Sequence, residues 1–487
     1  MKETPALTEL LAISPVDGRY RSDTAGLAEY ASEFALIKHR VRVEILYLIK
    51  LIGQVDRDLS AEEEQNLTDS YLNLTYADAQ KIKDIETKGV PGINNGKKTD
   101  HDVKSVELFL RDRFKGTSLE DRLEFFHFGL TSEDVSNIAY TLMLKDNLQK
   151  HIVPAIIKLE EKLVDIAQTY SQLVMPGRTH GQPAIPTTLG KEMAVFADRI
   201  ATQLDALCKI ELKGKLNGAI GAYSSFTVTY PAVDWEKFSR EFVESLGLTH
   251  NPLTTQIEPH DSMVAVFHKM IHINQILTGF NQDMWGYISD EYIVQKRAEG
   301  EVGSSTMPQK INPIKFENSE GNLGISNALL GYLANKLPIA RFQRDLSDST
   351  VQRWIGTAMA TSLLAYKNTL LGLNKCEPNE EHLKSELDKH WEMLAEPIQQ
   401  ILRREGVSGA YDILKKATQG KKWTSDSIGE FVNEANIGGE ARQEILNLSP
   451  HTYVGIAPQL AMGAVLRVRK TLEAAKKYSL DIQQPHS

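Results

Sequence analysis

Residues 266–287 read VFHKMIHINQILTGFNQDMWGY, and this stretch decides the fold class. Its apolar side chains recur at alternating spacings of four and three residues. They are Val266, Met270, Ile273, Leu277, Phe280, Met284 and Tyr287. This period places them along one stripe of an α-helix, and a stripe of such length is typical of a long helix that packs against nearly parallel neighbours.

Two further stretches carry the same period, one from Ile152 to Tyr170 and one from Met359 to Leu373. Three long helices with such stripes predict an elongated helical bundle in the middle of the chain. Strand signals are sparse, and the best of them is Phe-Thr-Val-Thr-Tyr at 226–230. We therefore predict a mainly α fold, in which the central bundle assembles into a multi-subunit helical core.

Turn-forming residues mark where the chain divides. The stretch KGVPGINNGKK at 88–98 predicts an exposed loop within an N-terminal helical domain. The stretch NKCEPNE at 374–380 ends the last predicted bundle helix. The sequence thus predicts an N-terminal helical domain over 1–120, a central long-helix bundle over 121–374 and a C-terminal helical domain over 375–487.

Composition restricts the partners of the chain. Its 487 residues include 55 basic and 64 acidic side chains, so the net charge of −9 argues against a nucleic-acid binder. The two cysteines, Cys208 and Cys376, lie far apart without metal-ligand spacing. The N-terminal residues lack the apolar core of a signal peptide, and no apolar run is long enough to span a membrane. We expect a cytoplasmic protein with no membrane partner.

The segment from Gly303 to Asn312 reads GSSTMPQKIN and is followed by a proline. It contains no apolar repeat that could serve a core, so it predicts a loop. Backbone N–H groups beside the glycine can point at a serine oxygen, while Lys310 and Asn312 can hold an anionic group nearby. A polar surface loop without chemistry is the alternative that the composition alone leaves open.

Four other polar segments interrupt the helical pattern. They are SPVDGRY at 14–20, DHDVK at 100–104, LTSED at 130–134 and RTHGQPA at 178–184. The third also fits a simple helix N-cap, because a hydroxyl residue is followed by acidic residues. In the fourth, His180 precedes a glycine and a proline at an expected helix break, which makes it a candidate general acid.

Together these segments resemble the fumarase/aspartase superfamily, and within it the adenylosuccinate lyase family. The loop at 303–312 is similar to the signature of the whole superfamily. The narrower resemblance rests on 14–20, 131–134, 178–184, TTQIEPHD at 254–261 and QRDLSDSTVQR at 343–353. Two residues depart from the pattern. Gln309 is the form typical of argininosuccinate lyases, and Asp100 stands where the family usually has asparagine.

The resemblance implies a β-elimination that releases fumarate from adenylosuccinate, giving AMP, and from the ribotide SAICAR, giving AICAR. It implies no metal and no cofactor, and a homotetramer whose active sites are shared between chains. By the same resemblance Ser304 is the base and His180 the acid. The residues that it implies for substrate binding are Arg19, Tyr20, Asp100, His101, Asp102, Thr131, Ser132, Gln256, Lys310, Ile311, Asn312, Asn318, Arg344, Ser349, Thr350, Val351, Gln352 and Arg353.

Two alternative functions stay open at this point. Gln309 favours an argininosuccinate lyase, although a phosphate-bearing substrate explains Arg344 and Arg353 better than a substrate that itself ends in a guanidinium. The other alternative is a non-catalytic structural relative, which would have no need of Ser304 or His180. A metal site is not expected, because the neighbouring residues of each His-Asp pair point in different directions on a helix.

Overall fold

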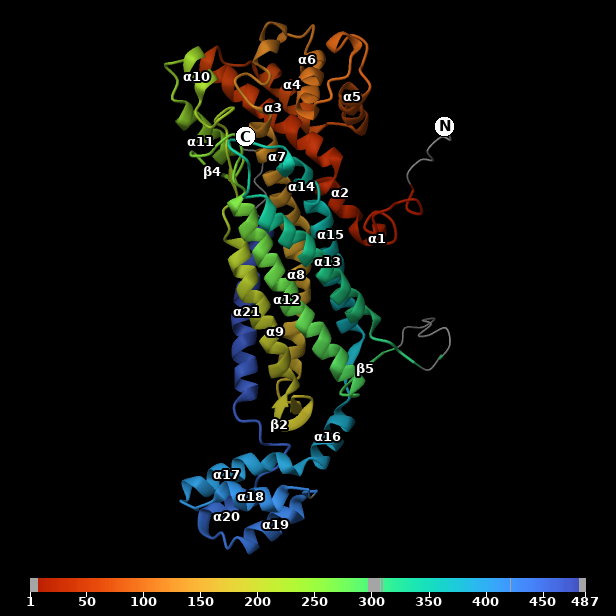
Figure 1. The fold of residues 1–487 in the computed structure, drawn as a ribbon, viewed down its shortest axis with the longest axis vertical. Coiled ribbons are helices and arrows are strands. Elements are labelled where there is room, and N and C mark those ends of the chain that lie inside the picture. Colours follow the sequence, from red (N-terminus) through yellow and green to blue (C-terminus); the bar gives the residue numbers. More distant parts are fainter. Residues whose placement is uncertain (1–7, 297–306, 308–309, 421, 481–487) are drawn as a thin grey trace.

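A computed structural model describes residues 8–296, 307, 310–420 and 422–480. The molecule is elongated, with a long helical bundle between a group of helices at the N-terminal end and a smaller group at the opposite end (Figure 1). The predicted mainly α fold is confirmed. Within the described residues no helix is both long enough and apolar enough to cross a membrane.

The bundle contains the three helices that the apolar stripes predict, which are α8, α12 and α15. Its long helices are α7 (Ser132–Asn147), α8 (Val153–Thr169), α9 (Leu189–Cys208), α12 (Asp261–Ser289), α13 (Ile314–Lys336), α15 (Ile355–Asn374) and α21 (Ala457–Leu480). A π-helical turn, Leu148–Ile152, joins α7 to α8. Met270, Leu277 and Phe280 of α12 are completely buried, as their place on the stripe predicts.

The N-terminal group of helices has a hydrophobic core of its own, which includes Ile45, Leu48 and Val106. Its helices are α3 (Glu33–Val55), α4 (Ala61–Leu72), α5 (Tyr76–Thr87) and α6 (Asp102–Arg113). The short helices α1 (Arg21–Thr24) and α2 (Ala28–Ala31) contact α15 of the bundle. Helices α10 (Ser224–Thr229), α11 (Trp235–Ser245) and α14 (Ser347–Gln352) lie at the same end of the bundle (Figure 1). The segment 88–98 forms turns and one short 3₁₀ helix, Asn94–Gly96, and most of it is exposed.

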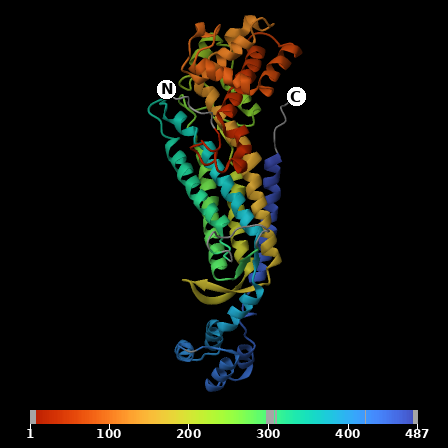
Figure 2. The same ribbon diagram turned by 90° about the vertical axis from the view of Figure 1, so that its right-hand side faces the viewer.

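The opposite end carries a small group of helices with a third core, which includes Ile398, Leu414 and Val432. Its helices are α16 (Glu380–Lys389), α17 (Ala395–Arg404), α18 (Ala410–Thr418), α19 (Ser425–Glu434) and α20 (Gly439–Leu446). The chain then returns, and α21 lies along α8 and α9 inside the bundle (Figures 1 and 2). The predicted domain boundaries at residues 120 and 374 stay a prediction. Helix α21, which follows the second boundary, shares the core of the bundle.

Short strands form three pairs in the described part of the chain. The hairpin β1 (Val174–Thr179) and β2 (Gln182–Thr188) is antiparallel, β3 (Lys213–Gly214) and β4 (Thr249–His250) are parallel, and β5 (Ile293–Gln295) and β6 (Cys376–Pro378) are antiparallel. The hairpin extends across the lower end of the bundle (Figure 2).

The strand predicted at 226–230 is wrong, because these residues belong to helix α10 and its end. Phe226 is completely buried and packs against Trp235 with ring centroids 4.8 Å apart. The hydroxyls of Thr227 and Thr229 donate to backbone carbonyls four residues earlier, at 3.1 and 2.8 Å. Tertiary packing and these local hydrogen bonds outweigh the strand preference of the side chains.

Candidate active site

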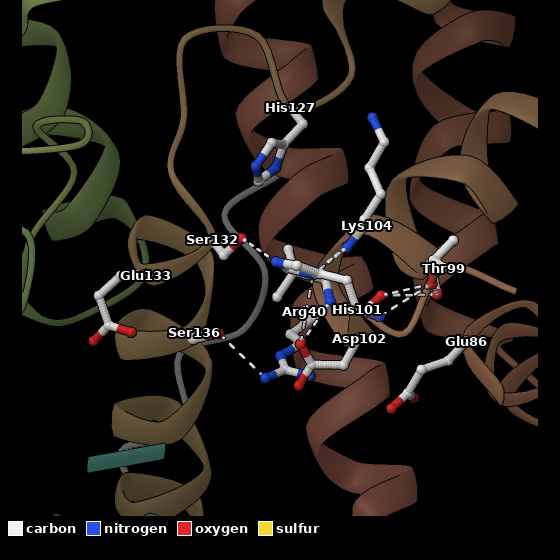
Figure 3. Close-up of polar contacts among 12 residues, drawn as sticks. Arg40, Glu86, Thr99, His101, Asp102, Lys104, His127, Ser132, Glu133 and Ser136 are labelled. Atoms are coloured by element: carbon white, nitrogen blue, oxygen red, sulfur yellow. Dashed lines mark hydrogen bonds and ion pairs between the residues drawn. The ribbon is translucent and has the colours of Figure 1, made fainter. Parts of the chain in front are cut away.

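His101 and Ser132 meet where α6 and α7 begin (Figure 3). His101 caps α6, and its Nδ1 accepts a hydrogen bond from the backbone N–H of Lys104 at 3.2 Å. In the neutral ring the proton therefore lies on Nε2, which is 3.5 Å from Ser132 Oγ. The arrangement presents an imidazole N–H and a hydroxyl at one place on the protein surface.

The segment that carries Thr131 and Ser132 is fixed by Asp134, which is completely buried. The Asp134 carboxylate accepts from the backbone N–H of Thr131 at 2.9 Å, which is one half of a capping box. It also contacts the buried ammonium group of Lys215 at 2.9 Å. The N-cap interpretation of the segment and the binding interpretation are therefore compatible, since the cap holds Ser132 in place.

Asp102 lies between two guanidinium groups. Arg40 contacts its Oδ2 at 2.8 Å and Arg353 at 3.3 Å (Figure 3 shows Arg40). Burial by itself would raise the pKa of Asp102, but Arg40 and Arg353 outweigh burial and lower it. Asp102 is therefore a fixed anion that orients Arg353. Arg353 also forms an ion pair with Glu33.

Arg344 reaches the same end of the bundle from the segment before α14. Its Nη1 donates to Glu133 Oε2 at 3.3 Å and to Gln256 Oε1 at 3.2 Å. Gln256 is held in turn by a hydrogen bond from its Nε2 to the carbonyl of Ala219, at 2.7 Å. The structure thus links Gln256 and Arg344 to the first turn of α7, beside Ser132.

The predicted residues 349–352 lie on α14, next to Arg344 and Arg353. Ser349 is partly exposed and Thr350 is exposed, whereas Val351 and Gln352 are buried. The Gln352 Nε2 lies 3.2 Å from the His260 Nε2 at the start of α12. Among residues 349–352 the accessible hydroxyls are therefore those of Ser349 and Thr350, while the buried side chains of Val351 and Gln352 fix the helix.

A second set of predicted residues lies farther down the bundle. Asn318 Nδ2 donates to the hydroxyl of Tyr20 at 3.3 Å, and the guanidinium of Arg19 lies 6.0 Å from the centre of the Tyr20 ring. Lys310 is exposed, and the carbonyl of Ile311 accepts a hydrogen bond from Gln295 at 3.3 Å. Asn312, also predicted to bind substrate, is half-buried and lies two residues before α13.

Ser304 and Gln309 lie outside the described residues. Asp100, by contrast, is described, and it adopts a left-handed backbone conformation with φ of 51° immediately before His101. Its carboxylate forms an ion pair with Lys98 at 2.8 Å, and both side chains are more than half exposed. Asp100 is therefore adjacent to the His101–Ser132 contact but makes its own contact with the 88–98 loop.

His180 occupies the tip of the β1–β2 hairpin rather than a helix break. Thr179 pairs with Gln182, and the two residues between them, His180 and Gly181, have φ values of 54° and 74°. Two consecutive positive values define the tight turn that matches the twist of a hairpin. Arg178 anchors the tip, because its Nε lies 3.1 Å from the Tyr292 hydroxyl and 3.0 Å from Asp290. The imidazole of His180 is therefore exposed on a supported turn.

Within one chain His180 lies far from Arg344, and the length of α12 shows how far. His260, which precedes α12, contacts Gln352 at the upper end of the bundle, while Asp290, which follows α12, contacts Arg178 at the lower end (Figure 1). The 29 residues of α12 span about 43 Å. No single chain therefore brings His180 together with His101, Ser132 and Arg344.

Within the described part of the chain, one group of side chains has metal-ligand spacing. It consists of Glu133, His260 and Asp348, whose ligand atoms lie within 4.8 Å of one another. The guanidinium of Arg344 already contacts Glu133, so this group faces a fixed positive charge.

The sequence patterns missed Arg40 and Glu133. Arg40 is only 2% exposed although it stands in the apolar run of α3, and a charge at such a position is the signal that could have identified it. Glu133 was not singled out because it follows an N-cap residue, and acidic residues are common in the first turn of a helix.

Comparisons with known proteins agree with this fold. A lyase family model matches residues 54–326, and a model of the adenylosuccinate lyase C-terminal region matches residues 340–454. A fumarate lyase from Mesorhizobium sp. BNC1 has the same fold, with a TM-score of 0.72 over 91% of this chain and 97% of the other, at 17% identity. A 3-carboxy-cis,cis-muconate lactonizing enzyme from Pseudomonas putida gives 0.70 over 92% and 97%, at 18% identity. The chain therefore belongs to the lyase family of the fumarase/aspartase superfamily.

Curated relatives define the family more narrowly. An adenylosuccinate lyase from Escherichia coli (strain K12) is 44% identical over 458 residues, which cover 93% of this chain and 98% of the relative. Another from Buchnera aphidicola subsp. Acyrthosiphon pisum is 45% identical over 459 residues, with the same coverage. Within the superfamily, this chain is a member of the adenylosuccinate lyase family.

Proposed function

We propose that the chain cleaves adenylosuccinate to AMP and fumarate, cleaves SAICAR to AICAR and fumarate, and works as a homotetramer with shared active sites. Family membership and the two arginines near Ser132, Arg344 and Arg353, support a substrate that carries a phosphate. The expectation of a cytoplasmic enzyme without a nucleic-acid or membrane partner accompanies this proposal.

The reaction needs a base, an acid and a stabilised carbanion. A proton leaves the carbon beside a carboxylate, the negative charge passes into that carboxylate, and the C–N bond then breaks as the nitrogen gains a proton. In our proposal Ser304 removes the first proton, and His180 supplies the second. An alcohol titrates roughly six units above neutrality, so an unaided serine base would cost about 8 kcal/mol. Backbone N–H groups and the Lys310 ammonium would have to offset that cost.

A local cluster of positive side chains can bind the negative charges of the substrate. One phosphate and two carboxylates carry about four negative charges, whereas the protein as a whole is acidic. Arg344 contacts the buried carboxyl group of Glu133, and Arg353 contacts the half-buried carboxylate of Asp102. These contacts fix the directions of the two guanidinium groups. We assign the phosphate and ribose to these arginines and to Arg19 and Tyr20, and the succinyl carboxylates to Thr131, Ser132, Lys310 and Asn312.

The observation that carries the shared-site proposal is the distance set by α12. About 43 Å of helix lies between the His180 hairpin and the Arg344 group in one chain. An acid and a phosphate site so far apart can act on one small substrate only if they come from different chains. Closed symmetry then repeats the same combination at each site of the assembly.

Mixing two inactive variants tests this arrangement. His180→Ala and Ser304→Ala should each lose most activity, at least about a thousandfold in turnover, because each removes a group used in the transition state. Mixed one to one with subunit exchange, they should regain activity at about a quarter of the sites, since chance pairs an intact histidine chain with an intact serine chain that often. Mixed tetramers, seen by mass measurement, that stay inactive would show that His180 and Ser304 come from one chain, and would overturn the proposal that different chains supply them.

An ultraviolet time course tests the substrate. The wild-type protein should convert adenylosuccinate, and SAICAR, with release of fumarate. It should leave argininosuccinate unchanged, and Gln309→His should keep adenylosuccinate cleavage within about tenfold. Cleavage of argininosuccinate by the wild-type protein would overturn the proposed substrate class.

A further inference from the structure

Three helices begin at one buried point beside Arg344. Glu133 lies in the first turn of α7, His260 precedes α12, and Asp348 lies in the first turn of α14. Their exposed fractions are 2%, 0% and 4%. Each of the three has a buried polar atom, Glu133 Oε1, His260 Nδ1 and Asp348 Oδ2, without a hydrogen-bond partner among the described residues.

Arg344 is the group that connects this buried cluster to the surface. Its guanidinium contacts Glu133 Oε2 at 3.3 Å from one side and Gln256 Oε1 at 3.2 Å. Its own side chain is 21% exposed, so Arg344 is less buried than the three residues of the cluster. Glu133 leaves α7 on the side away from His101 (Figure 3), so it does not take part in the His101–Ser132 contact.

We propose that Glu133 is a positioning residue for Arg344: from the buried cluster it holds the guanidinium in the direction that receives the substrate phosphate. This inference rests on the proposed function, in which Arg344 binds that phosphate. Glu133 itself is too deeply buried to touch the substrate. It acts through the direction of Arg344, because a carboxyl group and a guanidinium meet in a defined geometry.

The charges around Glu133 set how its action changes with pH. The groups that face it are Arg344, Asp348, Lys215 and Asp134, together with His260. Burial raises the pKa of Glu133 to about 8, with Asp348 and Asp134 adding to the effect and Arg344 and Lys215 opposing it. Burial, with Arg344 and Lys336, lowers the pKa of His260 to about 4, so that ring is neutral.

The raised pKa of Glu133 predicts weaker phosphate binding in alkaline solution. Near pH 7 Glu133 is mainly protonated and orients Arg344 without neutralising it. Above about pH 8 Glu133 ionises, and its negative charge then competes with the phosphate for Arg344. Glu133→Gln keeps a neutral group of the same shape, and it should remove this part of the pH dependence.

Calorimetric binding of AMP to the full-length protein tests the inference without requiring turnover. Glu133→Ala should weaken AMP binding at pH 7 at least about tenfold, Glu133→Gln should restore it to within about threefold, and only the wild type should lose affinity above about pH 8. Arg344→Ala should weaken binding by a similar factor, and the double variant Glu133→Ala with Arg344→Ala should be no weaker than Arg344→Ala alone.

Glu160→Ala is the matched control, since Glu160 is also a fully buried glutamate but lies in α8, away from the cluster. It should bind AMP as the wild type does. Additive losses in the double variant, or Glu133→Ala binding as tightly as the wild type, would overturn the positioning role. So would a loss of AMP binding on EDTA dialysis that a divalent cation restores, because the cluster would then be a metal site. Tight AMP binding without adenylosuccinate turnover would instead count against the proposed function alone.

Discussion

Asp134 is the residue on which the Thr131–Ser132 segment depends. Its carboxylate accepts from the backbone N–H groups of Thr131, Asn217 and Gly218, and it pairs with Lys215, which is as fully buried as Asp134 itself. These contacts join the start of α7 to the loop after β3. A cap that a sequence pattern can predict thus serves as the centre of a buried polar network.

Removing that carboxylate should leave a buried ammonium group without a counter-charge. We expect Asp134→Ala to lower the free energy of unfolding by roughly 3–5 kcal/mol, measured by chemical denaturation. Asp134→Ala combined with Lys215→Met should recover much of the loss, since no unpaired charge then remains. Equal stability of Asp134→Ala and the wild type would show that the Asp134–Lys215 pair contributes little to the free energy of unfolding.

Glu160 presents the opposite case, a carboxyl group buried without a partner. It is completely buried in α8, and both of its oxygens lack hydrogen-bond partners among the described residues. Burial raises its pKa well above the usual value, and the charge of Asp198 adds to this. Folding therefore favours the protonated form of Glu160, whereas the unfolded chain releases that proton above about pH 4.3.

The sign of the pH effect follows from this difference. A group whose pKa is raised by folding contributes stability below its unfolded pKa, and the contribution is lost as pH rises towards the folded value, by up to about 1.4 kcal/mol per unit. Glu160→Gln should therefore raise the Tm relative to the wild type more at pH 7.5 than at pH 5. Glu161→Gln, in an exposed ion pair on the same helix, should show no such trend. A constant difference across this range would contradict a protonated Glu160.

At the scale of elements, the hairpin β1–β2 depends on its two-residue turn. Gly181 has φ of 74°, and a Cβ at this position would meet no atom within 4 Å, so only the backbone conformation opposes a side chain. Gly181→Ala should cost about 1–2 kcal/mol of local strain, which the turn relieves by changing shape. Such a change moves His180.

We expect Gly181→Ala to lower kcat at least about tenfold while the Tm stays within about two degrees. Gly429→Ala is the matched control, because Gly429 lies within α19 and a Cβ there also meets nothing within 4 Å. It should leave kcat unchanged. A wild-type kcat for Gly181→Ala would show that the conformation of the hairpin tip does not matter for the reaction.

The elements also show what a sequence can predict. Helices α8, α12 and α15 were predictable because an unbroken apolar stripe has one solution, a buried helix face. The prediction of a strand at 226–230 was wrong, because Phe226 packs against Trp235 rather than beside a strand partner. Motifs pointed to His101, Ser132 and Arg344 as candidates, whereas Arg40 and Glu133 make contacts with distant segments. A charge in an apolar run is a local sign of Arg40, but no local pattern shows which segment it contacts.

For the whole molecule, α13 presents an uncovered apolar face. Ile314, Ile325 and Tyr332 are 52%, 57% and 58% exposed, and their separations of 11 and 7 residues place them on one side of the helix. The opposite side of α13 packs against α12 and α15. In the proposed homotetramer this face is covered by another copy of the chain.

A charge on this face should separate the subunits. We expect Ile325→Asp to lower the mass measured by light scattering and to abolish activity at the same time, because a site built from several chains cannot survive dissociation. Leu446→Asp is the control, since Leu446 is 40% exposed but belongs to the group of helices at the opposite end of the bundle. Full activity in a monomeric Ile325→Asp variant would contradict shared sites.

The length of α12 has a consequence for how such a chain can change during evolution. One inserted residue would shift everything beyond it by about 1.5 Å along the helix and turn it by about 100°. The hairpin at one end and the arginines at the other would then no longer face their respective neighbours. Insertions and deletions within α12 should therefore be less well tolerated than substitutions of its exposed side chains. By this argument the length of the helix constrains sequence change here more than the identity of its exposed residues does.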